Sequence, residues 1–213
     1  MKDIVIIGCG DFGREVNWII NRINNVRKEW NILGFVDDNE KYIGKTVDGL
    51  KVIGNIEKLN EIGEVYTICA ICNSKARKSI IKKVSEYENV SFATLVDPTC
   101  ICHEMATIGE GTIMCCNTMI NINTKIGNHV AMVDRSAVGH DTTIGDYSVL
   151  LVGAVIAGDS QIGECCEIGM GVNMIQNKKI GDNVIVGAGA CVVKDLPDNC
   201  TAVGVPAKVI KYN

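Results

Sequence analysis

Every sixth residue from Val96 to Val192 is apolar, and no insertion interrupts the count. The residues of this column are Val96, Cys102, Ile108, Met114, Ile120, Ile126, Met132, Val138, Ile144, Leu150, Ile156, Ile162, Ile168, Met174, Ile180, Val186 and Val192. With 47% of the chain apolar, such a run has a chance probability on the order of 10⁻⁵. A period of 3.6 cannot keep every sixth residue on one face, so the pattern excludes a helix.

Two further columns repeat with the same period. The residue two positions before the apolar one is small or β-branched everywhere except at Lys178, and isoleucine-glycine pairs recur every 18 residues. Glycine follows the apolar residue at Gly109, Gly127, Gly139, Gly145, Gly163, Gly169, Gly181 and Gly187. We therefore predict a triangular coil of three short strands, with the apolar column filling a narrow prism and glycines allowing unusual dihedrals at the corners.

The N-terminal part has a different pattern. A strand from Asp3 to Ile7 is followed by the glycine-rich run Gly8–Gly13 and then by a helix, with Asp11 as a candidate N-cap. A second strand from Ile32 to Val36 ends in two acids, Asp37 and Asp38. This order of strand, Gly-x-Gly-x-x-Gly, helix and acid is typical of a phosphate-binding turn, because the helix N-terminus favours an anion.

This N-terminal part is short. Only one more strand, Val65 to Ile71, and one more helix, about 74–86, follow. That is half of a dinucleotide fold, with room for a mononucleotide or nucleotide-sugar. A glycine-rich turn that only packs the helix on the strand stays open as the alternative. We predict a small α/β Rossmann-like domain over residues 1–90, a β-helix of hexapeptide repeats over 91–195 and a tail over 196–213.

Composition narrows the function. The net charge is −4, aromatic residues make up 5%, and no basic run is interleaved with aromatic residues, so a nucleic-acid partner is not expected. No apolar span is long enough to cross a membrane and no signal peptide is evident, so we expect a soluble, cytoplasmic protein. The eleven cysteines then favour reduced thiols, several packed as small hydrophobic residues.

A metal site is not predicted. The three histidines, His103, His129 and His140, fall at three different phases of the six-residue count, so their nitrogens do not converge as zinc requires. The pair Cys69-x-x-Cys72 has metal or redox spacing, but no second pair follows it, and packing in a strand is the simpler interpretation.

His140 is the candidate general base. It follows the corner glycine Gly139 at an outward phase, and Gly158 stands 18 residues later, one coil above it. A glycine there leaves an open notch with a bare N–H beside an imidazole, which is the pairing that acyl transfer needs for its base and its oxyanion. A solvated surface histidine remains the alternative. Cys115, Cys116 and Cys165 lie at outward phases and stay open as nucleophiles.

The whole chain resembles the hexapeptide-repeat acetyltransferases that carry an N-terminal nucleotide-sugar domain, among them sialic-acid O-acetyltransferase-like proteins and UDP-amino-sugar N-acetyltransferases. The matching segments are the opening Gly-x-Gly-x-x-Gly, Gly34–Asn39, Val52–Gly54, Gly139–Asp141 and Gly204–Lys208. The resemblance implies left-handed winding, homotrimers, and acetyl-CoA bound in the groove between neighbouring prisms.

The resemblance also implies roles for particular residues. His140, Asp141 and Gly158 are the catalytic set, with the Gly158 N–H holding the oxyanion, while Met170 and Ala188 of the neighbouring subunit line the acetyl-CoA groove. The acceptor site comprises Gly10, Asp11, Phe12, Asp37, Asp38 and Gly54. The chain departs from the family pattern in two places. Gly10-Asp11-Phe12 replaces Ser-Gly-His, and Asp141 replaces Glu. Adjacent strand residues point oppositely, so Asp141 can reach the imidazole only through a turn or from a neighbouring subunit.

We therefore predict an acetyl-CoA-dependent acetyltransferase that modifies an amine or hydroxyl of a sugar or nucleotide-sugar by direct attack in a ternary complex. The alternatives are an acyltransferase of the same fold with a serine-like or lipid-like acceptor, and a trimeric scaffold that only binds a nucleotide-sugar. Lys194, which stacks three coils above His140, and Lys208 of the tail are expected to meet the phosphates of acetyl-CoA. Outward Ile122, Val133, Leu151 and Ile175 are expected to need cover in a trimer.

Overall fold

The computed structural model describes residues 1–213 and divides into two compact units. The N-terminal unit comprises Met1–Cys72 with Ala76–Pro98, and the C-terminal unit comprises Asn73–Lys75 with Thr99–Asn213.

The N-terminal unit is built on one sheet with the strand order β3-β4-β2-β1-β5-β6. Its elements are β1 (Lys2–Ile7), α1 (Asp11–Val26), β2 (Trp30–Val36), β3 (Thr46–Val47), β4 (Leu50–Gly54), the 3₁₀ helix η1 (Ile56–Glu61), β5 (Val65–Cys69), α2 (Ser74–Val84), β6 (Val90–Phe92) and β7 (Leu95–Val96). The central β1 pairs in parallel with β2 on one side and β5 on the other. The carboxyl ends of these strands thus meet where the chain changes direction across the sheet, the usual ligand site of such folds.

The first strand of this unit agrees with the sequence pattern, but the predicted N-cap of the first helix does not. Ile4, Val5, Ile6 and Ile7 are buried, which confirms a strand covered on both faces. The N-cap of α1 is Gly10 and not Asp11, so that prediction is wrong. Asp11 is the first helical residue, and its fully exposed carboxylate lies 3.6 Å from Arg14, one turn on. The pairs of β4 with β2 and of β6 with β5 were not predicted.

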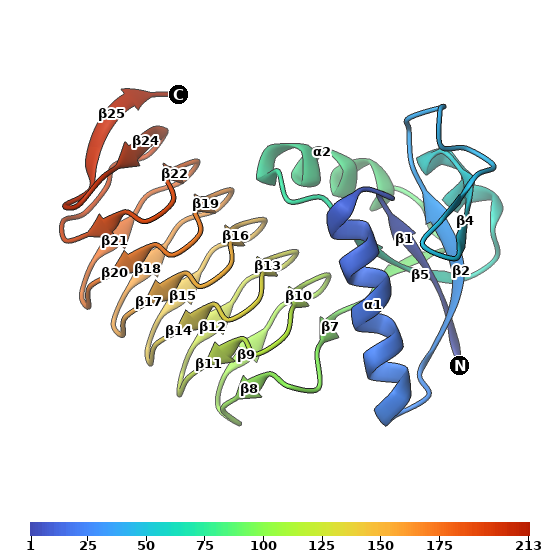
Figure 1. Ribbon diagram of the computed structural model, residues 1–213, viewed down its shortest axis with the longest axis horizontal. Helices are drawn as coiled ribbons and strands as arrows, with labels where there is room; N and C mark the ends of the chain where they lie inside the picture. Colours follow the sequence, from blue (N-terminus) through green and yellow to red (C-terminus); the bar gives the residue numbers. More distant parts are fainter. The chain divides into compact units, whose positions relative to one another are not determined.

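The C-terminal unit is a parallel β-helix whose coils stack in chain order, from the green β8 to the red β24 in Figure 1. The β8 sheet contains β8 (Ile101–Cys102), β11 (Met119–Ile120), β14 (Ala137–Val138), β17 (Val155–Ile156), β20 (Asn173–Met174) and β23 (Cys191–Val192). The β9 sheet contains β9 (Thr107–Ile108), β12 (Lys125–Ile126), β15 (Thr143–Ile144), β18 (Gln161–Ile162) and β21 (Lys179–Ile180). The β10 sheet contains β10 (Ile113–Met114), β13 (Ala131–Met132), β16 (Val149–Leu150), β19 (Glu167–Ile168), β22 (Ile185–Val186), β24 (Cys200–Val203) and β25 (Lys208–Tyr212).

The register follows the sequence period. Ile120 pairs with Val138, Val138 with Ile156 and Ile156 with Met174, which are steps of 18 residues. The apolar column is buried from Met114 to Val192. Cys102 is exposed, contrary to its expected packing, because β8 is the edge strand of its sheet. The triangular coil is thereby confirmed.

The corner glycines have another role than the one expected. Every sixth residue from Gly111 to Gly189 has a positive φ, and this set includes bulky residues such as Tyr147. The glycines that follow the apolar column do not belong to it. A Cβ at Gly109 would lie 2.4 Å from the carbonyl oxygen of Gly127, and one at Gly163 would lie 2.2 Å from Oδ1 of Asp182. These glycines are therefore needed for the close approach of the next coil, and the predicted dihedral reason is wrong.

The last residues extend the β-helix. β24 pairs in parallel with β22, and β25 folds back antiparallel on β24. Between these strands, the Ala207 N–H donates to the Cys191 carbonyl at 2.8 Å, and the Cys191 N–H donates to the Gly204 carbonyl at 3.0 Å. The segment around Gly204 thus lies against the final strand of the β8 sheet. This is the strand that precedes Lys194.

Candidate active site

The corner after β14 holds His140 beside a glycine of the next coil. The imidazole occupies the space beside the Cα of Gly158, where a Cβ would lie 2.5 Å from Nε2 of His140. A Cβ at Gly139 would in turn lie 2.6 Å from the Gly158 nitrogen. Both glycines are therefore required if the ring and the Gly158 amide are to lie side by side. The side chain of His140 is 49% exposed, so the ring can be reached from solvent.

Asp141 reaches the imidazole through the turn. Its φ of 54° lies in the left-handed region, so its side chain does not alternate with that of His140 as it would along a strand. Oδ2 of Asp141 lies 2.9 Å from Nδ1 of His140, while Oδ1 accepts a hydrogen bond from Nδ2 of Asn123 at 3.0 Å. Of the two routes open from the sequence, the turn is the one observed.

The ionisation of Asp141 determines which ring nitrogen of His140 carries the proton. The hydrogen bond from Asn123, followed by that from His140, lowers the pKa of Asp141 below its ordinary value, so the carboxylate is ionised near neutral pH. An ionised carboxylate only accepts hydrogen bonds, so Nδ1 carries the proton. The neutral ring then presents its lone pair on Nε2, beside Gly158. This is the state that a general base requires.

The Gly158 N–H has no acceptor in the protein, unlike the equivalent N–H groups at another corner of the coil. There, the Asn128 N–H donates to Oδ1 of Asp146 at 2.7 Å, and the Glu164 N–H donates to Oδ1 of Asp182 at 2.9 Å. Each acceptor stands 18 residues further on. At the His140 corner the corresponding residue after Gly158 is Gln176, and no protein acceptor takes the Gly158 N–H. This amide is therefore available to a ligand.

The remaining cofactor candidates lie elsewhere on the coil. Met170 and Ala188 follow strands of the β10 sheet, at a different corner from His140, and Met170 is 56% exposed. One chain therefore does not bring them to Gly158. Lys194 and Lys208 are exposed on the final coil and on β25. The hydrogen bonds of Cys191 with Ala207 and Gly204 tie the two segments that carry these lysines to one end of the prism.

The glycine-rich loop has the geometry of a phosphate-binding turn. Gly8 has a φ of 94°, and a Cβ at Gly13 would lie 2.1 Å from the Gly8 carbonyl oxygen, so these two glycines shape the turn and the helix contact. Gly10 has open space around its Cα. No side chain caps α1, which leaves the N–H groups of Asp11 and Phe12 without a capping side chain at the positive end of the helix.

The acids after β2 brace this loop. Oδ2 of Asp37 accepts from the Cys9 N–H at 3.0 Å and from the Cys9 thiol at 3.2 Å, and Oδ1 accepts from the Asn39 N–H at 2.9 Å. The Asp37 N–H donates to the Gly54 carbonyl. Burial acts to raise the pKa of Asp37, but the hydrogen bonds from Cys9 and Asn39 prevail and lower it. Asp38 is exposed and accepts the Ile56 N–H at 3.0 Å.

Several other candidates are not brought to His140. His129 is buried and stacks on Tyr147, with ring centroids 5.5 Å apart, and Nδ1 of His103 accepts the Met105 N–H. Cys115, Cys116 and Cys165, which the six-residue count places at outward phases, are buried. A nucleophile must be reached by its substrate, so these thiols are not candidates in the folded chain.

The chain is similar in sequence and in fold to known proteins. Residues 3–84 match the model of the PglD N-terminal domain. UDP-N-acetylbacillosamine N-acetyltransferase of Bacillus subtilis is 30% identical over 122 residues, which cover 54% of this chain and 51% of that protein. The chain thus aligns with about half the length of this curated relative.

Solved structures match over nearly the full length. Perosamine N-acetyltransferase from Caulobacter crescentus, a variant with one histidine replaced by asparagine and in complex with CoA and GDP-perosamine, superposes with a TM-score of 0.91 at 27% identity. That match covers 99% of this chain and 98% of the other. The acetyltransferase domain of PglB from Neisseria gonorrhoeae, in complex with acetyl coenzyme A, has a TM-score of 0.88 at 25% identity over 98% and 99% of the two chains.

In fold and over nearly its full length, the chain is similar to these sugar N-acetyltransferases. Its residues 3–84 match the PglD N-terminal domain and precede the β-helix. The fold class expected from the sequence is confirmed, and these matches support the expected resemblance to sugar acetyltransferases. No helix of the structure has the length and apolar character needed to cross a membrane.

Proposed function

We propose that this protein transfers the acetyl group of acetyl-CoA to the amino group of a nucleotide-linked sugar, with His140 as general base. The observation that carries the proposal is the corner itself, where Asp141 holds the Nδ1 proton and leaves Nε2 beside the unoccupied Gly158 amide. The choice of an amine follows the relatives, which are named as N-acetyltransferases.

The reaction is a direct transfer. The acceptor nitrogen attacks the thioester carbonyl, Nε2 of His140 takes the nitrogen's proton, and the carbonyl oxygen becomes negative. The Gly158 N–H donates to that oxyanion. Collapse of the intermediate breaks the carbon–sulfur bond, and the leaving thiolate takes the proton from Nε2 and departs as CoA. Asp141 keeps the ring oriented and stabilises the imidazolium. The nucleotide of the acceptor is assigned to Gly10, Asp11 and Phe12 at the start of α1, with Asp38 and Gly54 beside them.

Acetyl-CoA is assigned to the edge of the prism above His140. Lys194 and Lys208, at one end of that edge, supply positive charge for its phosphates. Met170 and Ala188 lie at another corner, so they can line the same groove only from a neighbouring subunit of a homotrimer. Lys194→Ala combined with Lys208→Ala is expected to raise the KM for acetyl-CoA several-fold, more at low salt, with kcat nearly unchanged. An unchanged KM at low ionic strength would remove both lysines from the cofactor site.

The proposal is tested by product formation with a panel of UDP-, GDP- and CMP-linked amino sugars and free amino sugars. Because the chain has eleven cysteines, loss of thioester absorbance and product mass are better readouts than thiol reagents. We expect His140→Ala to lower kcat by about 10² or more, since positioned proton transfer contributes 10²–10⁴. His103→Ala is the matched control and should transfer at the wild-type rate.

Each alternative has its own outcome in this panel. A His140→Ala variant with wild-type kcat contradicts the assigned base. Acetylation of a serine-like or lipid-like acceptor but of no sugar identifies another acyltransferase of the same fold. Nucleotide-sugar binding in a thermal-shift measurement, with no acetyl transfer by the wild-type protein to any acceptor, identifies a binding scaffold.

A further inference from the structure

A second carboxylate faces the imidazole from the next coil. Oδ2 of Asp159 lies 4.0 Å from Nδ1 of His140, on the same ring nitrogen that Asp141 contacts at 2.9 Å. Candidate ligand atoms of these three side chains all lie within 4.8 Å of one another. A separation of 4.0 Å is too long for a hydrogen bond, so Asp159 acts on the ring through its charge alone.

The coil register holds this second carboxylate in place. The Asp159 N–H donates to the His140 carbonyl at 2.9 Å, and the Asp141 N–H donates to the Ile122 carbonyl at 3.0 Å. Asp141 and Asp159 both have a φ of 54°, so each occupies the same left-handed corner position, one coil apart. The backbone therefore fixes the position of Asp159 in the coil next to His140.

Neither Asp141 nor Asp159 forms an ion pair with a lysine. Lys125 lines the same surface hollow as Asp141, and Lys178 and Lys179 line the hollow beside Asp159 with Asp195, but no ion pair joins these lysines to either acid. The Lys178 ammonium donates instead to the Asn177 carbonyl at 3.0 Å. The groups facing His140 therefore carry negative charge.

We infer that Asp159 is a positioning residue of this site, the second of two carboxylates that stabilise the imidazolium form of His140. The inference rests on the proposed function, in which that imidazolium forms when Nε2 takes the acceptor's proton. Asp141 selects the tautomer by its hydrogen bond to Nδ1. Asp159 adds a second negative charge from the next coil, 4.0 Å from the same nitrogen. An opposite charge within 4–6 Å favours the charged form of a titrating group.

The diagnostic variant is Asp159→Asn. It keeps size and shape, and asparagine tolerates a left-handed backbone, so the corner should fold unchanged. Loss of the charge makes the imidazolium less stable, so the base stays unprotonated to lower pH. We expect the acidic limb of the kcat/KM profile to move to lower pH and the plateau rate to fall about tenfold, because a weaker base transfers protons less efficiently. Added salt should reduce the difference from wild type.

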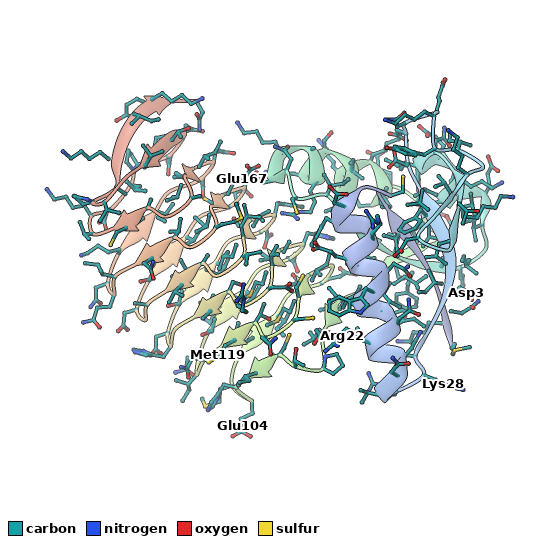
Figure 2. The ribbon with its side chains drawn as sticks, in the orientation of Figure 1. Asp3, Arg22, Lys28, Glu104, Met119 and Glu167 are labelled. Atoms are coloured by element: carbon teal, nitrogen blue, oxygen red, sulfur yellow. The ribbon has the colours of Figure 1, made fainter.

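Two further variants make the result specific. Asp159→Glu keeps the charge and should restore most of the shift in the acidic limb. Glu104→Gln is the control for net charge. Its carboxylate is exposed on the first coils and points away from them, where the label stands in Figure 2, so neither limb nor plateau should change.

The outcomes separate this inference from the proposed function. If His140→Ala abolishes transfer while Asp159→Asn keeps the wild-type limb and plateau, the role of Asp159 is overturned and the base is retained. If His140→Ala transfers at the wild-type rate, the proposed function itself fails, whatever Asp159→Asn does. If Asp159→Glu is as impaired as Asp159→Asn, the effect is steric and the charge argument is wrong.

Discussion

Two glycines determine what His140 faces. Gly139 lacks the Cβ that would lie 2.6 Å from the Gly158 nitrogen, and Gly158 lacks the Cβ that would lie 2.5 Å from Nε2. Neither has a positive φ, so neither is needed for its backbone dihedrals. At this corner glycine serves the site, because any side chain would displace the ring or cover the amide.

Gly158→Ala tests this role of glycine, because it adds one methyl group beside the imidazole. The added methyl must push the half-exposed imidazole aside, so kcat should fall at least about tenfold, as expected for misplaced acid–base groups. The midpoint of thermal unfolding should change little, because the ring can swing into solvent. Gly63→Ala, at a glycine with open space around it, is the control. A fully active Gly158→Ala protein would show that ring and amide are not used together.

The Cys9 thiol reports on the state of the glycine-rich loop, Gly8–Gly13. Burial, and then its hydrogen bond to Asp37, raises the pKa of Cys9 to about 11. Alkylation at about pH 8 should therefore be slow and should accelerate as pH rises toward that pKa, because only the thiolate reacts. Asp37→Asn removes the charge that opposes ionisation, so the labelling of Cys9, followed by peptide mass spectrometry, should become several-fold faster.

The same variant links the loop to function. Because Asp37 braces Cys9 and Asn39, its loss should weaken acceptor binding and leave the KM for acetyl-CoA nearly unchanged. Equal loss for both ligands would mean that the N-terminal unit supports the fold and does not hold the acceptor.

At the scale of the element, the corner position with positive φ recurs in every side of the coil. Asparagine occupies it at Asn117, Asn123, Asn177 and Asn183, in keeping with its tolerance of the left-handed region. Arg135, with a φ of 59°, is an exposed exception. Left-handed backbone at such residues costs on the order of 1 kcal/mol.

Arg135→Asn should therefore stabilise the β-helix by up to about 1 kcal/mol, measured as the free energy of unfolding in urea. Arg135→Val is the opposite case, since a β-branched residue is disfavoured at positive φ, and it should destabilise. Equal stability of the two variants would contradict the strain assigned to this corner.

At the scale of the whole molecule, the faces of the prism differ. The outward residues of the β9 sheet are Thr107, Lys125, Thr143, Gln161 and Lys179, all polar. The β8 sheet exposes Ile101, Met119 and Val155 at 65%, 37% and 42%. Of the residues expected to need cover, Val133 is already buried, while Ile122 and Ile175 are exposed. The apolar face that a trimer could cover is thus the β8 sheet.

We expect light scattering at micromolar concentration to give about three times the 23.0 kDa of one chain. Val155→Lys should lower the mass toward that of the monomer, because it places a charge in an apolar contact. Thr143→Lys, on the polar β9 sheet, should leave the mass unchanged. A wild-type mass near 23.0 kDa would contradict the trimer.

The sequence alone determined the coil. An unbroken six-residue period admits one regular backbone, and the 18-residue register then places Gly158 above His140 without further information. The glycine-rich turn after β1 was equally readable, because strand, glycines and helix follow within one short segment. In both cases the pattern is local or strictly periodic, so the amino-acid sequence is enough to predict the structure.

The tertiary structure decided what happens at the corners. That Asp141 turns back onto Nδ1, that Asp159 joins it from the next coil, and that Asp37 is engaged by Cys9 were not readable from spacing. These contacts depend on left-handed dihedrals and on side chains packed between segments up to 28 residues apart. The period records which residues point inward. It carries no information on how a corner aims its carboxylates, because that direction arises only when one coil lies on the next.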